Sequence, residues 1–580
     1  MSALRRMAAA LRANPGVAAV VALGIAWGVI MHAGGWAQQA HFAEVRALAS
    51  GSPEIDRWHW ETGDKAWIDG HFYSVKSPGV AALSIPFYAA IDALGGHELA
   101  RDAAANARRA SHPRWNPHVV PPYASYGYDA PRAIRVQSRV EENTPILWAL
   151  TLIVAVIPSV ALLLGVRWLA DRLLPGYGTA AAITLGIATM LMVFAAEYFS
   201  HAIGAALGFA AFAVLFSERA GPPRLALVAA GGLLAGLAVT FEYQTGLVGA
   251  VLFFYAALRA PAARLPRAVV YAGGALAGAL PALAYNAWAL GSPLRFAYSD
   301  AVAVIGRSGH AELGLNSDGF FGITLPRLDA ALDVLVSGRG VLVLTPVLVA
   351  AAIGVVLMRR RGHRAEAWVI AGVTGAYLLY NFGYWQPLGG GTPGPRFLIP
   401  ILPFLALGLA FAYQRLRALT LALAIPSAIW MVVASVTYPL IGFQGSGLWV
   451  QDLGDGTLEH TLLTALGVRD GWLALAPVLV AIGAAIVFAA AATPRARIGD
   501  IRPALAALAV WAAVFVLAPP LTEDTTTTLG GDTSALLPTA AAVVIATVVL
   551  VVLRYRERRG ERAGRSERAG GELALSEPSP

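Results

Sequence analysis

The residues best suited to bind a charged ligand include two lysines in the first loop of the chain. Among the 43 basic residues, only Lys65 and Lys76 are lysines. Lys76 lies in the stretch "GHFYSVKSPGVAALSIPFYAA", directly before a Ser-Pro-Gly turn and an apolar run. An ammonium is a compact charge that binds phosphate, and a helix start at Pro78-Gly79 adds free N–H groups. We therefore expect Lys76 to bind a phosphate; the alternative is a lysine that anchors an interfacial helix.

A dense patch of acids, histidines and tryptophans, "SPEIDRWHWETGDKAWIDGH", precedes Lys76. Tryptophan rings stack on sugars and carboxylates hold sugar hydroxyls, so this composition favours a sugar site. The alternative is a solvated loop stabilised by its own ion pairs. Its histidines and acids lack a fixed metal-binding spacing, so we assign no metal site here, and the sequence leaves a divalent cofactor open. The candidate ligand-binding residues are Trp58, His59, Asp64, Lys65, His71 and Tyr73, and the patch also contains the carboxylate of Asp56.

Histidine–acid pairs occur at two further positions. His41 and Glu44 are three residues apart in a helical pattern, so they share a face and suggest a general base; the alternative is a surface pair. Glu197 and His201 are four apart at the end of an apolar run, where ionisable groups are functional candidates. Glu242 ends another apolar run and is a weaker candidate.

A glycine-rich stretch, "NFGYWQPLGGGTPGPRFLIPILPF", contains the remaining cation of interest. Backbone N–H groups of such a loop can bind an anion, and Arg396 follows the loop directly before an apolar run. We therefore expect Arg396 to be a second phosphate ligand. The alternative is a flexible connection.

The composition identifies the class of protein. Of 580 residues, 57% are hydrophobic and 13% are charged, and the mean hydropathy is +0.61. Soluble domains carry about 25% charged residues, so these values predict an all-α polytopic membrane protein. The net charge of +8 comes from arginines between apolar runs, which favours contact with the lipid bilayer and not with nucleic acid. The chain has no cysteine, which excludes disulfides and thiolate metal sites.

The alternation of apolar runs with arginine clusters predicts the topology. About 14 transmembrane helices fit, and the positive-inside rule places both termini in the cytoplasm. Two long loops then lie on the extracytoplasmic side. The expected organisation is a membrane module at 1–413 with loops at about 37–144 and 291–338, further transmembrane helices at 414–553, and a disordered basic tail at 554–580.

The order of these motifs resembles that of the GT-C-type glycosyltransferases that use polyprenyl-phosphate sugars. The similarity is to the protein O-mannosyltransferase and aminoarabinose-transferase group. It covers about residues 17–413 and is carried by "GHFYSVKSPG", the acid Glu197 and "GPRFLIPILPF". It implies an inverting transfer at the outer leaflet of a bacterial-type plasma membrane. It also implies that Lys76 holds the lipid phosphate. Independently of the resemblance, the apolar run from Pro78 to Leu94 is too short to span and predicts an interfacial or re-entrant (juxtamembrane) helix in the first loop.

One departure from the family pattern concerns catalysis. The family begins its first loop with an Asp-Glu pair, whereas this chain has Gln38-Gln39, and glutamine cannot act as a base. Either Glu44, Asp56 or another loop acid supplies the base, or the chain is a member without catalysis. We therefore expect a transferase that moves a monosaccharide from a polyprenyl phosphate to an envelope acceptor. The alternatives are a flippase for an envelope precursor and an inactive carrier-lipid binder.

Overall fold

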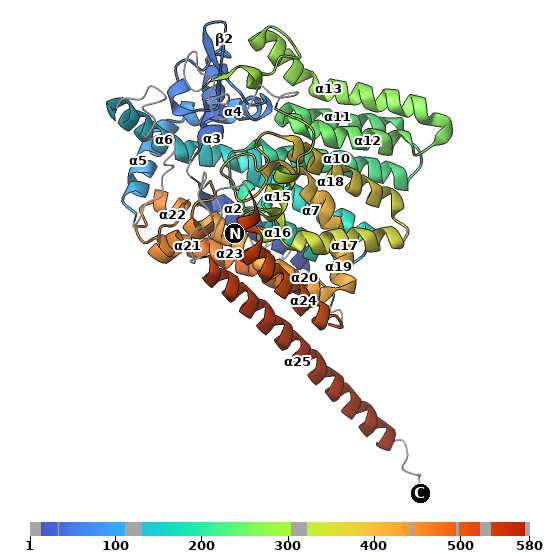
Figure 1. Ribbon diagram of the computed structural model, residues 1–580. Coiled ribbons are helices and arrows are strands. Elements are labelled where there is room, and N and C mark those ends of the chain that lie inside the picture. The colour runs from blue at the N-terminus through green and yellow to red at the C-terminus, as the bar shows by residue number, and fades with distance from the viewer. Residues whose placement is uncertain are drawn as a thin grey trace.

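The structure is a computed structural model, about 76% helical. Figure 1 shows a helical bundle with a small β-hairpin at one end and the long last helix projecting from the other end. Residues 1–12 and 575–580 of the termini lie outside the described residues, as do parts of both predicted loops. The described residues are 13–32, 34–110, 130–302, 322–440, 446–494, 498–522 and 535–574.

The first half of the chain forms the helices around the first long loop and the centre of the bundle (Figure 1). A one-turn π-helix, η4, joins α6 to α7. The helices are α2 (Pro15–Val29), α3 (Trp36–Ala49), α4 (Gly79–Ala93), α5 (Gly96–Arg108), α6 (Ala130–Thr151), η4 (Leu152–Val156), α7 (Ile157–Leu173), α8 (Gly178–Ile187), α9 (Leu191–Phe194), α10 (Ser200–Ala220), α11 (Leu225–Phe241), α12 (Gly246–Ala257) and α13 (Arg264–Leu290).

The second half of the chain packs against these helices. Its last helix, α25, continues through most of the segment for which the sequence predicts a disordered tail. The helices are α15 (Leu328–Val336), α16 (Val341–Leu344), α17 (Val347–Arg360), α18 (Arg364–Gly383), the 3₁₀ helix η8 (Arg396–Ile401), α19 (Leu402–Arg415), α20 (Arg417–Val436), α21 (Ser446–Asp455), α22 (Leu462–Ala465), α23 (Gly471–Ala492), α24 (Ile501–Leu517) and α25 (Leu536–Ala574).

The helix lengths and surfaces are those of an α-helical membrane protein. Within the described residues, 7 helices are long and apolar enough to cross a membrane, or up to 9 if each of two bent pairs is one span. Shorter apolar helices, such as α2 and α11, add to these, and the total of about 14 spans stays a prediction. One bent pair is α4 with α5, which meet at 88°. Large apolar side chains are exposed along α13, α23 and α25, as expected for surfaces that contact lipid.

Glycines allow α11 and α13 to pack with their backbones in contact. A Cβ atom added at Gly236 would lie 1.9 Å from the Ala275 carbonyl oxygen, and one at Gly274 would lie 2.3 Å from that of Ala229. Small residues at four-residue spacing commonly permit such close packing in membranes. Near the start of α13, Arg267 donates two hydrogen bonds to the buried carboxylate of Glu218 in α10, which compensates the charge of both groups.

The first loop contains a small antiparallel sheet. Strand β2 (Lys65–Ile68) pairs with β3 (His71–Ser74) on one edge and with β4 (Ala301–Val302) on the other. The hairpin turns at Asp69 and Gly70, whose φ angles are 51° and 95°. Positive φ at both positions is typical of a two-residue Asp-Gly turn. The sheet carries the chain from the first loop directly to Lys76 and the start of α4.

The two predicted modules on either side of residue 413 share one hydrophobic core. A single cluster of buried side chains contains residues from Ala19 to Leu550. A second small sheet, β1 (Ile30–Met31) with β5 (His460–Thr461), joins the end of α2 to the region after α21. The last third of the chain is therefore part of the same packed body as the first loop.

The α11–α13 contact gives a matched test of the packing. Gly274→Ala should lower stability by about 1–3 kcal/mol, because its methyl group forces the helix backbones apart. Gly273→Ala is the control, since a Cβ atom there meets nothing within 4 Å, and it should be neutral or slightly stabilising. Melting temperatures of the purified variants measure the difference. Equal melting of the two variants would contradict the packing described here.

Candidate functional site

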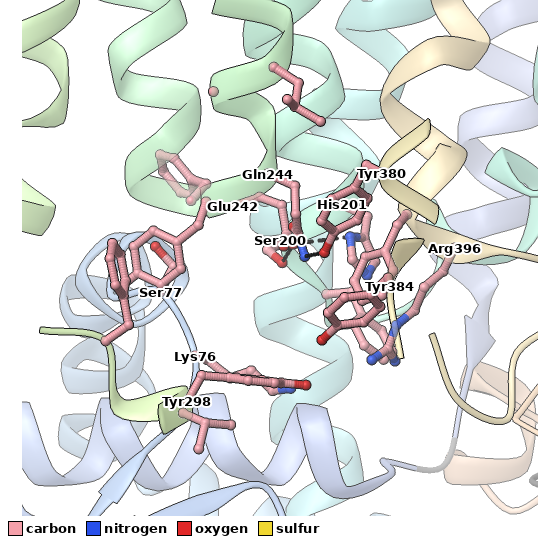
Figure 2. Close-up of a pocket in the computed structure, with 18 of the residues that line it drawn as sticks. Lys76, Ser77, Ser200, His201, Glu242, Gln244, Tyr298, Tyr380, Tyr384 and Arg396 are labelled. Atoms are coloured by element: carbon pink, nitrogen blue, oxygen red, sulfur yellow. Dashed lines mark hydrogen bonds and ion pairs between the residues drawn. The ribbon is translucent and has the colours of Figure 1, made fainter. Parts of the chain in front are cut away.

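A cavity of about 430 Å³ lies among the first loop, the bundle and the glycine-rich loop. Figure 2 shows Lys76 and Arg396 approaching its open part from opposite sides. Both side chains line the cavity, although 320 residues separate them in the sequence. Its remaining walls are largely aromatic and apolar, including Phe296, Tyr384 and Phe397. The cavity therefore combines two cations with an apolar lining.

The Ser-Pro-Gly sequence after Lys76 fixes the lysine at the cavity. The Ser77 hydroxyl donates a hydrogen bond of 2.6 Å to the carbonyl oxygen of Thr240 at the end of α11. Gly79 packs so closely there that a Cβ atom would lie 2.5 Å from the same oxygen. The ammonium of Lys76 is 2.6 Å from the Asp64 carboxylate, and both side chains are mostly buried. Lys76 is thus held beside Asp64 and against α11.

The glycine-rich loop positions Arg396. Gly389, Gly390 and Gly394 all have positive φ angles, and a Cβ atom at Gly389 would lie 2.9 Å from Cγ of Arg396. The buried Arg339 donates a hydrogen bond to the Gly390 carbonyl oxygen, which fixes the loop. The N–H groups of Gly389 and Gly394 donate within the loop. The loop therefore wraps the arginine, whereas the sequence suggests that its N–H groups bind the anion directly.

The Arg396 guanidinium has no compensating carboxylate within the described residues. It lies 5.5 Å from the ring centre of Phe199 and 5.3 Å from that of Phe397. Its Nε atom is buried and has no hydrogen-bond partner in the described part of the chain. A cation held against aromatic rings with an unused donor is suited to bind an anion.

Four helical segments begin at the cavity wall. The lining includes Ser77 just before α4, Ser200 at the start of α10, Gly246 at the start of α12 and Arg396 at the start of η8. The N–H of Gly246 donates to the carbonyl oxygens of Tyr243 and Gln244, and that of Arg396 to the carbonyl oxygen of Leu388. At α4 and α10, the partial positive charge of a helix N-terminus adds to the charge of the two cations.

A histidine–carboxylate pair lies on the α10 side of the cavity (Figure 2). Nδ1 of His201 is 3.0 Å from Oε2 of Glu242, and the Ser200 hydroxyl donates to the same oxygen. Burial opposes ionisation of Glu242, but His201, Ser200 and Lys76 outweigh it and lower its pKa to about 2. The other lining histidine, His41, has a pKa lowered to about 3, mainly by burial.

The three predicted catalytic acids do not line this cavity. Asp56 is half-exposed at the edge of the small sheet, where it accepts hydrogen bonds from the Phe72 N–H and from His71. Glu197 lies in a separate cavity of about 10 Å³, where it accepts a 2.7 Å hydrogen bond from the Gln38 amide. Burial raises the pKa of Glu197 to about 7 against the opposing effect of its polar neighbours.

Glu44 is fully buried behind the cavity wall. Neither of its carboxylate oxygens has a hydrogen-bond partner among the described residues. Burial raises its pKa to about 8, while the nearby hydroxyls of Tyr285 and Ser74 oppose the shift. Glu44 is absent from the residues that line the cavity, although His41 on the same helix, α3, lines it.

The predicted sugar-binding patch is divided between a buried part around Lys65 and an exposed part around His71. Lys65 is 1% exposed and donates to the His59 carbonyl oxygen, with its ammonium 5.2 Å from the Phe72 ring centre. Burial lowers its pKa to about 7. Trp58 packs against Arg46 at 5.1 Å. Of the patch, Trp58, His59, Asp64, Lys65, His71 and Tyr73 contact other loop residues and do not line the cavity.

One group of side chains in this loop has spacing compatible with a metal ion. Among the described residues, Glu54, Asp56 and His71 place ligand atoms within 4.8 Å of one another. Two of these residues are exposed, and the group lies outside the cavity. The sequence did not single out Tyr298, Tyr380, Tyr384 or Ser200, all of which line the cavity. Tyr380 and Tyr384 are four apart in a helical run ending at the glycine-rich loop, which is a signal for a shared face.

No protein-family model, curated protein or solved structure matches the chain.

The burial of Glu44 predicts how stability varies with pH. Because its folded-state pKa is about 8 and its ordinary value is 4.5, the folded state binds more protons between these values. The contribution of Glu44 protonation to the free energy of unfolding is fully present below pH 4.5 and is lost as the pH rises through 8. Glu44→Gln removes this loss, so its stability relative to the native protein should rise by up to about 1.4 kcal/mol per pH unit in that window.

The measurement is the melting temperature from pH 5 to pH 9. Glu98→Gln is the control because the Glu98 side chain is 82% exposed. Parallel pH curves for Glu44→Gln and the native protein would show that Glu44 is not buried as described.

Proposed function

We propose that the protein is a membrane glycosyltransferase that uses a polyprenyl-monophosphate sugar. The observation that carries this proposal is the cavity in which Lys76, Arg396 and four helix starts converge. A phosphodiester that joins a sugar to a polyprenyl chain matches its two properties, because its phosphate can pair with the cations and its polyprenyl chain can pack on the aromatic walls. The resemblance of the sequence motifs to GT-C-type enzymes supports the same ligand.

The proposed location is a bacterial-type plasma membrane with the cavity on the extracytoplasmic side. The arginine-rich connections support this orientation through the positive-inside rule. Both termini then lie in the cytoplasm, and the acceptor is an envelope glycan, glycolipid or exported protein. This arrangement lets a lipid-linked donor reach the cavity from the outer leaflet.

The proposed chemistry uses the cations to stabilise the leaving group. As the bond between the anomeric carbon and the phosphate oxygen breaks, negative charge develops on the phosphate. Lys76 and Arg396 are fixed before the reaction, so they stabilise this charge without reorganisation. Asp64, which contacts Lys76, keeps the ammonium oriented.

A second candidate function is carrier-lipid binding without catalysis. The positions of Glu44, Asp56 and Glu197 favour it, because none of these predicted catalytic acids lines the cavity. A flippase for an amphipathic envelope precursor is the third candidate. The same ligand would occupy the cavity in all three cases, and transfer or transport distinguishes them.

Removal of either cation should weaken binding of polyprenyl monophosphate. Each charge-assisted contact is worth about 1.5–3 kcal/mol, so Lys76→Ala or Arg396→Ala should reduce affinity roughly ten- to hundredfold. Arg101→Ala is the matched control, since Arg101 is 59% exposed and pairs only loosely with Glu98. Titration of the full-length protein in nanodiscs measures affinity, with polyprenol as the ligand that lacks phosphate.

Transfer is tested with labelled polyprenyl-phosphate hexoses and pentoses and an envelope fraction as acceptor. Labelled product that depends on Lys76 supports the transferase. Binding without product supports the carrier-lipid binder, and movement of intact lipid across vesicles supports the flippase. Equal affinities for polyprenyl monophosphate and polyprenol would overturn the transferase, the carrier-lipid binder and the flippase alike. They would show that the phosphate contributes nothing to binding.

A further inference from the structure

The proposed transfer needs a group that removes the proton of the acceptor hydroxyl. That group must reach the cavity, since its proton acceptor has to lie within hydrogen-bonding distance of the substrate. The predicted acids do not line the cavity. Among the lining residues, the side chains that carry an ionisable carboxylate or imidazole are His41, His201 and Glu242.

Glu242 is already engaged with its neighbours. Its Oε2 atom accepts from the Ser200 hydroxyl and faces Nδ1 of His201 at 3.0 Å. A carboxylate held in this way is a weak base, but it is well placed to orient an imidazole. The hydrogen bond places the His201 proton on Nδ1, so Nε2 carries the free lone pair.

The ring of His201 is also held by aromatic contacts. It stacks on Phe199 with an interplanar angle of 16° and meets the edges of Phe194 and Phe397. These contacts limit rotation of the His201 ring and therefore fix the orientation of its Nε2 atom. Within the described residues, Nε2 of His201 has no hydrogen-bond partner and is not among the fully buried unpaired atoms. Because His201 lines the cavity, this nitrogen can receive a proton there.

His41 lacks the features that make His201 suitable. Its side chain is buried, its Nδ1 atom has no partner among the described residues, and no described carboxylate pairs with it. The Glu242 and Asp64 carboxylates favour its imidazolium only through space, and burial, Lys76 and His201 outweigh them. His201, in contrast, has the Glu242 carboxylate in contact to balance that charge.

We propose that His201 is the general base of the transfer and that Glu242 is its positioning residue. This inference depends on the proposed function. The acceptor oxygen forms a bond to the anomeric carbon while its proton passes to Nε2 of His201. The bond from that carbon to the phosphate oxygen breaks, and its electron pair leaves with the phosphate held by Lys76 and Arg396. Release of the proton to water restores the neutral imidazole.

The test is a comparison of donor binding and transfer in the full-length protein. His201→Gln should keep the affinity for polyprenyl monophosphate within about threefold, while kcat for sugar transfer falls about 10²- to 10⁴-fold. Small imidazole added to His201→Gly should restore part of the rate. His97→Gln is the matched control, because His97 pairs with Asp92 at 3.2 Å on an exposed surface, and it should not change transfer.

Glu242 variants separate positioning from a structural role. Glu242→Gln should lower kcat about 10- to 100-fold with little change in KM for the donor, and Glu242→Asp should recover part of the rate. Melting temperatures of all variants identify any that fail to fold. Native kcat in a folded Glu242→Gln variant overturns the positioning role.

The outcomes also separate this inference from the proposed function. If the native protein transfers sugar and a folded His201→Gln variant transfers it at the native rate, the base assignment is wrong and the transferase stands. If the native protein binds polyprenyl monophosphate but transfers no sugar, both the transferase and the base are overturned and the anion site stands. Loss of donor binding together with transfer in His201→Gln would make His201 a binding residue only.

Discussion

The guanidinium of Arg396 is the group on which the account of this cavity depends. It lies in a wall of aromatic side chains, and none of the described carboxylates pairs with it. The Arg396 side chain is partly exposed at the cavity, so its charge faces the space that a ligand would fill. A phosphate bound there would form a charge-assisted contact with it.

The surrounding fold maintains this arrangement through local contacts. Ser77 and Gly79 hold the first loop against α11, and the glycine-rich loop encloses Arg396 with the help of Arg339. Helix α3 separates the cavity from a second polar group, in which Glu197 contacts Gln38. Glu459, from the last third of the chain, reaches the same group, with its carboxylate 3.4 Å from His32. The C-terminal helices therefore support the back of the site as well as the membrane-facing surface.

The sequence predicts correctly that the cations Lys76 and Arg396 lie at the site, but it does not predict the positions of the acids. Lys76 lies three residues before α4 and Arg396 is the first residue of η8, so the position of each is fixed by the start of a helix. Glu44 shares a face with His41 by spacing, but spacing does not decide which edge of that face meets the cavity. The Lys65 side chain is buried within its loop because the hairpin brings it into contact with Phe72 and His59. The Asp69-Gly70 turn was a usable signal for that hairpin, since this dipeptide between apolar residues favours such a turn.

If one phosphate lies between Lys76 and Arg396, a cryo-electron microscopy map of the full-length protein in nanodiscs with polyprenyl monophosphate should show it. We expect phosphate density in hydrogen-bonding contact with Nζ of Lys76 and the guanidinium of Arg396, and lipid-tail density along the aromatic wall. A well-ordered phosphate bound elsewhere, with these two side chains unchanged and the cavity empty, would contradict this placement of the phosphate.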